Sequence, residues 1–234
     1  MGVTFVTALY LPSGPLYKTL TVYVKLFKFI AATGVPIILY LDVRLTDLGK
    51  QLCEFYKNIQ CFFSTLDTSF VPADVTLPAN RNFAKDTADY MCIQLSKLKL
   101  LQDATAHANT THLAWIDFGI YQMFKDHALC HYWLNKIAYS EFQTNKIVSP
   151  SCYTLEAVKP FDNIYWNHSG SFLLGQRDQF GPAYDAQMAL VRANLPRLTW
   201  EVNYWTMMPD HFECYYGPHS DLILENVCVY IKTE

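Results

Sequence analysis

Two aspartates end apolar stretches that predict buried strands. Asp117 ends "THLAWID" (111–117), and Asp42 ends "PIILYLD" (36–42). A strand-end aspartate often caps the following turn, and composition alone favours that role. The functional alternative is a ligand for a hard divalent cation that also holds substrate phosphates. Gly119, two residues beyond Asp117, would allow a ligand or another backbone segment to approach closely.

A glutamate among aromatic residues is the next candidate. In "TWEVNYW" (199–205), Glu201 directly follows Trp200. Aromatic surroundings raise the proton affinity of a carboxylate, and the rings offer stacking surfaces of the kind that sugar chemistry uses. The alternative is a helix N-terminus, with Thr199 as its cap and Glu201 near the positive end of the helix dipole. The segment on its own favours neither.

Three histidines have spacings or positions that suit cation binding. His219 lies in the turn "YYGPHSD" (215–221), where an imidazole could ligate a cation, although a lone turn histidine is more often solvated. His127 and His131 have the i, i+4 spacing of zinc-binding helices, but no glutamate lies between them. We interpret that pair as structural.

The elements that must position these residues alternate between strands and helices. Strands are expected at 3–11, 36–42, 59–63, 111–117, 170–175, 212–217 and 227–231. Helices are expected at 15–33, 46–56 (capped by Thr46), 83–102, 126–139 and 178–195. This order predicts one α/β domain with a mostly parallel central mixed sheet flanked by helices. Ligands of such open sheets bind at the carboxyl ends of the strands, where both aspartates stand.

The composition narrows the function classes. Of the 234 residues, 51% are hydrophobic and 17% are charged, so we expect a large core and no disorder. A net charge of −3 without a Lys/Arg block argues against nucleic acid as a partner. Seven cysteines without a C-x-x-C pair predict reduced thiols. We find no leader and no transmembrane segment, and we expect a cytoplasmic protein.

No glycine-rich phosphate loop is present. The chain has neither G-x-G-x-x-G after its first strand nor G-x-x-x-x-G-K-[ST], which disfavours a Rossmann dehydrogenase and a P-loop NTPase. If the protein binds a nucleotide, a metal and side chains must hold the phosphates. Of Lys97 and Lys99, on the helix before the Asp117 strand, one could reach a phosphate while the other faces solvent.

Four motifs in order carry a resemblance to a known family. The segments "AWIDFGI", "SGSFLLGQRDQF", "TWEVNYW" and "YYGPHSDLI", with the early "VTFVTALY", resemble the HtrL/YibB-like family of glycosyltransferases over about residues 3–226. That family is related to nucleotide-diphospho-sugar transferases of the GT-A type. The resemblance implies a GT-A fold, with about residues 1–120 binding the nucleotide sugar and about 121–234 binding the acceptor.

The resemblance also implies a metal site. GT-A enzymes use a D-x-D at the end of a central strand to bind Mn²⁺ or Mg²⁺, which bridges the donor diphosphate. Asp117 matches the first aspartate, but the second position is Gly119, so the match is D-x-G. The resemblance then implies a cation held by Asp117, the diphosphate, waters and His219.

The same resemblance assigns the remaining site residues. Glu201 is the expected catalytic carboxylate, and Trp200, Tyr204 and Trp205 would stack on sugars, with core packing as the alternative for at least one of them. The expected nucleotide-sugar-binding residues are Thr7, Ala8, Tyr10, Asp42, Lys97, Asp117, Gly119, Gly170, Ser171 and Trp200.

The implied reaction moves a sugar from a nucleotide-diphosphate sugar to a glycan or another hydroxyl acceptor. Glu201 would act as general base if the reaction inverts, and would position the donor or stabilise an oxocarbenium-like state if it retains. The setting would be glycan assembly in a bacterium or a virus-infected cell. A non-catalytic nucleotide-sugar-binding or assembly protein on the same fold is the alternative. A phosphotransferase or hydrolase is disfavoured because a phosphate loop and a G-x-S-x-G elbow are missing.

Overall fold

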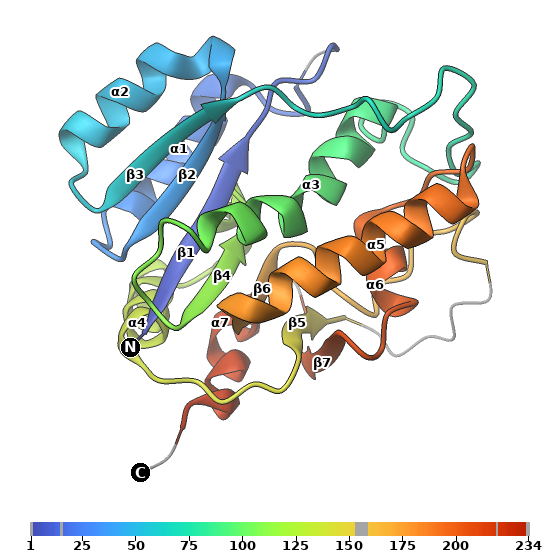
Figure 1. Cartoon of the computed structure of the whole chain (residues 1–234). Coiled ribbons are helices and arrows are strands. Elements are labelled where there is room, and N and C mark those ends of the chain that lie inside the picture. The colour runs from blue at the N-terminus through green and yellow to red at the C-terminus, as the bar shows by residue number, and fades with distance from the viewer. Residues whose placement is uncertain (1, 15, 153–158, 219, 233–234) are drawn as a thin grey trace.

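A seven-stranded mixed sheet forms the centre of the protein (Figure 1). The computed structural model describes residues 2–14, 16–152, 159–218 and 220–232. The strands are β1 (Val3–Leu9), β2 (Ile37–Asp42), β3 (Ile59–Ser64), β4 (His112–Ile116), β5 (Ile147–Ser151), β6 (Phe172–Gln176) and β7 (Phe212–Tyr216). Their order across the sheet is β3-β2-β1-β4-β6-β5-β7. The first four strands run parallel, β6 is antiparallel to both β4 and β5, and β7 is parallel to β5.

Helices cover both faces of this sheet, which confirms the predicted α/β class. The helices are α1 (Leu20–Ala31), α2 (Thr46–Phe55), α3 (Ala88–Ala104), α4 (His127–Tyr139), α5 (Phe180–Asn194), α6 (Glu201–Thr206) and α7 (Leu222–Asn226). Buried side chains of α3, α5 and α6 share one hydrophobic cluster, and those of α1, α2, α4 and α7 share another. No described helix has the length and apolar character needed to span a bilayer.

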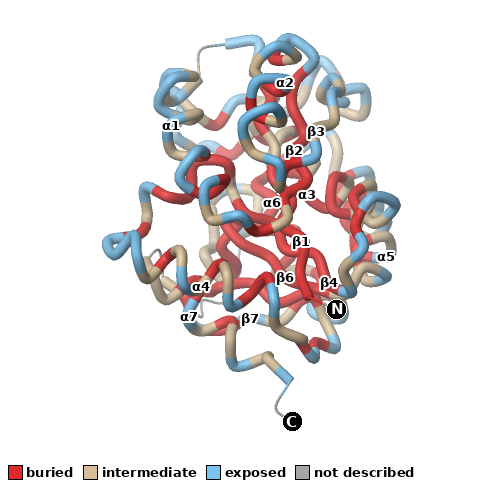
Figure 2. Tube along the Cα trace, turned by 90° about the vertical axis from the view of Figure 1, so that its left-hand side faces the viewer, coloured by how far each residue is buried: buried red, intermediate tan, exposed pale blue. Residues whose placement is uncertain are grey.

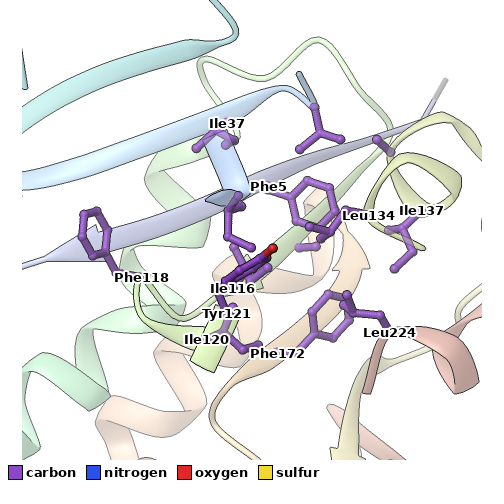
Figure 3. Packing of buried hydrophobic residues seen from close by; sticks show 14 of the residues in the cluster. Phe5, Ile37, Ile116, Phe118, Ile120, Tyr121, Leu134, Ile137, Phe172 and Leu224 are labelled. Atoms are coloured by element: carbon purple, nitrogen blue, oxygen red, sulfur yellow. The ribbon is translucent and has the colours of Figure 1, made fainter. Parts of the chain in front are cut away.

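Adjacent residues of the central strands point into the two hydrophobic clusters on opposite faces of the sheet. These are called here the α1/α4 cluster, which α2 and α7 share, and the α3/α5 cluster, which α6 shares. On β1, Phe5 belongs to the α1/α4 cluster while Val6 belongs to the α3/α5 cluster. On β4, Trp115 belongs to the α3/α5 cluster and Ile116 belongs to the α1/α4 cluster. Figure 3 shows Phe5, Ile116 and Phe172 within one of these cores, and Figure 2 shows burial concentrated along the strands. Because both faces are covered, these strands are continuous apolar runs rather than alternating ones.

The structure corrects two of the expected elements. Residues 227–231 were expected to be a strand, but Val227–Tyr230 is a 3₁₀ helix that continues from α7. Ile223, Leu224 and Val227 are all buried in the α1/α4 cluster, and this i, i+1, i+4 spacing is helical rather than the every-second-residue spacing of a strand. Thr46 is not a cap either: it is the first residue of α2, whose N-cap is Leu45.

Asp42 caps the 3₁₀ turn that precedes α2. Its carboxylate accepts hydrogen bonds from Arg44 N at 3.0 Å, Arg44 Nε at 2.8 Å, Arg44 Nη2 at 2.7 Å and Leu11 N at 3.3 Å. The side chain is 5% exposed. Hydrogen bonds from the Arg44 side chain lower the pKa of Asp42 to about 2, against the opposing effect of burial. Asp42 therefore joins the end of β1 to the end of β2.

These contacts predict a pH-dependent loss of stability in Asp42→Asn. The folded pKa lies below the ordinary value of 3.8, so the carboxylate stabilises the protein above about pH 4 and ceases to do so as the pH falls through 2. We expect the variant to lose about 1 kcal/mol of unfolding free energy at pH 7, because Arg44 stays partly solvated. Urea unfolding from pH 2.5 to 7 measures this.

The difference in unfolding free energy between the wild type and Asp42→Asn should become smaller below pH 4. Asp74→Asn, in an exposed loop, is the matched control and should follow the wild type throughout. A gap of constant size across the pH range would show that the Asp42 charge has no part in it.

Candidate active site

Lys97 is buried at the point where three distant segments meet. It lies on α3 with its side chain 2% exposed. Its Nζ is 3.0 Å from Glu201 Oε1 and 3.2 Å from Asp117 Oδ1, and it donates a hydrogen bond of 2.7 Å to the carbonyl of Gly170. The ammonium group thus joins α3, the end of β4, the turn before β6 and the start of α6.

The end of β4 fixes the position of Asp117. Its backbone N–H donates to the carbonyl of Ser171 at 3.0 Å, which extends the pairing of β4 with β6. Trp115 Nε1 donates to Asp117 Oδ1 at 2.8 Å, and the Trp115 ring lies 5.6 Å from Lys97 Nζ. Asp117 is therefore held by its own strand, while its side chain remains 39% exposed.

The two carboxylates of this network stabilise the charged form of Lys97. Burial by itself disfavours the ammonium form of Lys97, but the negative charges of Asp117 and Glu201 and their hydrogen bonds outweigh it and raise the pKa of Lys97. Two carboxylates around one ammonium leave a formal charge of −1. Glu201 is 5% exposed, so a ligand meets that negative charge chiefly at Asp117.

Gly170 occupies a position with no room for a side chain. A Cβ placed there would lie 2.1 Å from Glu201 Oε1 and 2.9 Å from Lys97 Nζ. The turn containing Ser169, Gly170 and Ser171 therefore lies directly against the ion pair, and the two serine hydroxyls hydrogen-bond each other at 2.7 Å. Glycine at 170 is required by this close approach.

Two cavities open on either side of the network. The first, called here the β1-side cavity, has a volume of about 260 Å³ and lies beside the end of β1 and the β1–α1 segment. The second, the α6-side cavity, has a volume of about 540 Å³ and lies beside α6 and the turn before β6. Lys97 and Asp117 line both cavities, so the network lies at their junction.

Most of the residues predicted from the sequence line one of these cavities. Those lining the β1-side cavity are Ala8, Tyr10, Lys97, Asp117 and Gly119. Those lining the α6-side cavity are Lys97, Asp117, Gly170, Ser171, Trp200 and Glu201. The structure thus brings together candidates that are up to about two hundred positions apart in the chain.

The remaining candidates lie elsewhere. Thr7 is fully buried, and Asp42 is occupied by Arg44; neither lines a cavity at the junction. Tyr204 and Trp205 are fully buried in the core, where the indole Nε1 of Trp205 donates to Gln187.

The cap expected at α6 is absent. The N-cap of α6 is Trp200, not Thr199. The Thr199 hydroxyl donates to the carbonyl of Pro160 and accepts from Asn203 Nδ2. Glu201 does begin the helix, but its partner is Lys97.

Three residues that line the site were not predicted from the sequence. Lys18, Lys85 and Tyr90 all line the β1-side cavity, and Lys85 and Tyr90 also line the α6-side cavity. Burial raises the pKa of Tyr90, and the nearby charges of Glu201 and Asp117 raise it further. No motif marks these residues, because each lies in a loop or near a helix start that only the fold places beside β4.

The described residues include one of the two protein ligands of the expected metal site, Asp117. Among them, no group of three His, Cys, Asp or Glu side chains is arranged to hold a metal ion. Asp117 Oδ1 is already engaged by Trp115 and Lys97. At Gly119, a Cβ would lie 3.1 Å from the ring of Tyr23, so a side chain there would require that ring to shift slightly. His219, the other predicted ligand, lies outside the described residues.

The histidine pair on α4 packs against an aromatic ring. His127 stacks on Tyr121 with ring centroids 4.3 Å apart, and His131 lies 6.1 Å from the same ring. These contacts support the structural interpretation of the pair.

Comparisons with known proteins show the fold. No family model matches the chain, and no curated protein matches it. Among solved structures, the apo form of the glycosyltransferase GlyE from Streptococcus pneumoniae has a TM-score of 0.50 at 9% identity, over 92% of this chain and 44% of that one. The bifunctional IspDF from Campylobacter jejuni has a TM-score of 0.48 at 8% identity, over 93% and 50%. The 4-diphosphocytidyl-2C-methyl-D-erythritol synthase from Anaerococcus prevotii has a TM-score of 0.48 at 12% identity, over 97% and 98%.

The chain spans about half the length of the first two structures. The likeness to GlyE, at a TM-score of 0.50, shows a shared Rossmann-like fold of the GT-A type. The narrower resemblance to the HtrL/YibB-like family stays a prediction.

The packing at Gly170 predicts that Gly170→Ala is destabilising. The added methyl group must push Glu201 and Lys97 apart, so we expect a loss of about 1–3 kcal/mol in unfolding free energy, as for other overpacked buried sites. Denaturant unfolding followed by circular dichroism measures it. Gly14→Ala is the control, because a Cβ there meets nothing within 4 Å and the variant should unfold like the wild type. Equal stabilities for the two variants would contradict the packing argument.

Proposed function

We propose that this protein is a glycosyltransferase that moves a sugar from a nucleotide-diphosphate sugar to a hydroxyl group of a glycan or another acceptor. The observation that carries the proposal is the carboxylate–ammonium–carboxylate network at the junction of two cavities. It lies at the carboxyl end of β4, the edge where open α/β sheets bind ligands. The fold shared with GlyE, which is named a glycosyltransferase, supports the proposal.

The two cavities differ in charge, which suggests a substrate for each. The charged residues lining the β1-side cavity are three lysines and one aspartate, a formal charge of +2. Those lining the α6-side cavity are two lysines and three carboxylates, a formal charge of −1. A donor diphosphate is favoured in the first and an uncharged acceptor hydroxyl in the second. In this arrangement the sugar crosses the junction beside Asp117.

Glu201 is the proposed catalytic base. It lines the α6-side cavity, so it can accept the proton of an acceptor hydroxyl placed there. The hydroxyl oxygen attacks the anomeric carbon, the bond from that carbon to the diphosphate oxygen breaks, and the nucleoside diphosphate leaves. Attack from the side opposite the leaving group inverts the anomeric centre. Trp200 also borders the α6-side cavity, but it is only 4% exposed and packs in the core, so it shapes the cavity wall rather than offering an open stacking face.

Lys97 has a positioning role in this scheme. It holds Asp117 and Glu201 at one ammonium group, so it fixes the two carboxylates relative to each other. The D-x-D resemblance implies Mn²⁺ or Mg²⁺; of its expected protein ligands the described residues supply Asp117 alone, and no step is assigned to a cation.

A panel of nucleotide-diphosphate sugars tests the proposed function. The protein is incubated with each sugar nucleotide, with and without saccharide acceptors, in EDTA and in Mn²⁺, and the release of nucleoside diphosphate is measured. We expect release from one sugar nucleotide, with an inverted linkage in the product by NMR. Binding without any release would support the non-catalytic alternative. Release of pyrophosphate from a nucleoside triphosphate would instead indicate nucleotidyl transfer.

Glu201→Gln should separate turnover from donor binding. Loss of the base should lower turnover by ~10²–10⁴-fold, while donor binding should not weaken, because Glu201 does not line the β1-side cavity and its loss leaves the Lys97 charge there less balanced. Single-turnover kinetics and calorimetry measure the two quantities. Glu54→Gln, on the exposed surface of α2, is the control and should behave as wild type. A variant that loses donor affinity but keeps turnover at saturation would make Glu201 a binding residue.

A further inference from the structure

Two lysines of the β1-side cavity have no carboxylate partner among the described residues. Lys18 and Lys85 both line this cavity, and neither is in an ion pair with a described carboxylate. Both are half-buried. They differ in this respect from Lys97, whose charge is already balanced by Asp117 and Glu201. The excess positive charge of the cavity therefore belongs to Lys18 and Lys85.

Local contacts bring these two lysines to one side of the cavity. Each ammonium group lies 5.9 Å from the centroid of the Tyr17 ring, and Lys85 Nζ also lies 4.7 Å from that of Tyr90. The backbone N–H of Ser13 donates to Asp89 Oδ2 at 2.7 Å, which holds the β1–α1 segment against the first turn of α3. Lys18 and Lys85 thus come from separate segments but share one aromatic neighbour.

The residues first expected to hold phosphate are poorly suited to it. A phosphate at Lys97 would have to displace two carboxylates and a carbonyl from a buried ammonium group. Position 119 is a glycine, so the D-x-G segment offers a cation one carboxylate rather than two. Lys18 and Lys85, in contrast, bring to the cavity that Asp117 also lines two positive charges without a carboxylate partner among the described residues.

We infer that Lys18 and Lys85 bind the diphosphate of the donor directly and take the place of the divalent cation at the leaving group. This inference rests on the proposed function and names the donor-binding groups of the same site. Lysine binds phosphate as a point charge on a flexible stem, so the two chains can close on a diphosphate without a rigid cage. Lys85, which lines both cavities, is placed nearest the junction where the bond to the sugar breaks.

Calorimetric titration of the whole chain with inorganic pyrophosphate and with UDP, CDP, GDP and ADP, in EDTA, tests the inference. We expect pyrophosphate and one nucleoside diphosphate to bind without metal, and more weakly as salt rises. Lys18→Gln and Lys85→Gln should each weaken binding about tenfold, the loss of one charged hydrogen-bonding group. Lys85→Arg keeps the charge and should retain most of the affinity. Lys28→Gln, on the exposed face of α1, should bind as wild type.

The outcomes separate this inference from the proposed function. Binding that requires Mn²⁺ or Mg²⁺ and is unchanged in both lysine variants overturns the inference, whether or not sugar transfer is found. Metal-free binding that both variants weaken supports it, even if no sugar nucleotide is turned over, in which case the proposed function alone fails. Melting curves of the variants show whether a loss of binding is a loss of folding.

Discussion

The structure of the site depends on one buried charge. Lys97 can remain ionised inside the core because Asp117, Glu201 and the Gly170 carbonyl surround its ammonium group. Removing one partner of a buried ion pair typically costs about 3–5 kcal/mol, because the other charge is left uncompensated. The segments that carry these groups must therefore stay in register, so α3, β4, the turn before β6 and the start of α6 are tied together by the same contacts that shape the site.

The pairing of Lys97 with two carboxylates also determines the charge of both cavities. A lysine that balances two carboxylates contributes little net attraction for a phosphate, so the positive potential of the β1-side cavity comes from Lys18 and Lys85. On the other side, Glu201 contributes a carboxylate to the α6-side cavity while Lys97 keeps it in place. One ion-pair network thus separates a region suited to an anion from a region suited to an uncharged hydroxyl group.

The sequence predicts the sheet and its ligand edge well, and the partners of individual side chains poorly. Continuous apolar runs mark β1, β2 and β4 because both sheet faces are covered. The same pattern puts both Asp42 and Asp117 at the end of a strand. In the structure, Asp42 forms an ion pair with Arg44, whereas Asp117 lines two cavities. Lys97 and Glu201 meet across 104 positions, a distance at which no local pattern operates. Trp205 of α6 and Trp200, the residue that caps this helix, both pack in the same core cluster, and only Trp200 also borders a cavity.

Glycine at 119 brings the end of β4 into close contact with α1. Glycine at 119 allows the Tyr23 ring of α1 to lie against the end of β4, where a Cβ would meet it at 3.1 Å. A side chain at 119 would press on the Tyr23 ring, and Tyr23 itself lines the β1-side cavity. The positive charge of this cavity comes from other side chains that line it, Lys18 and Lys85.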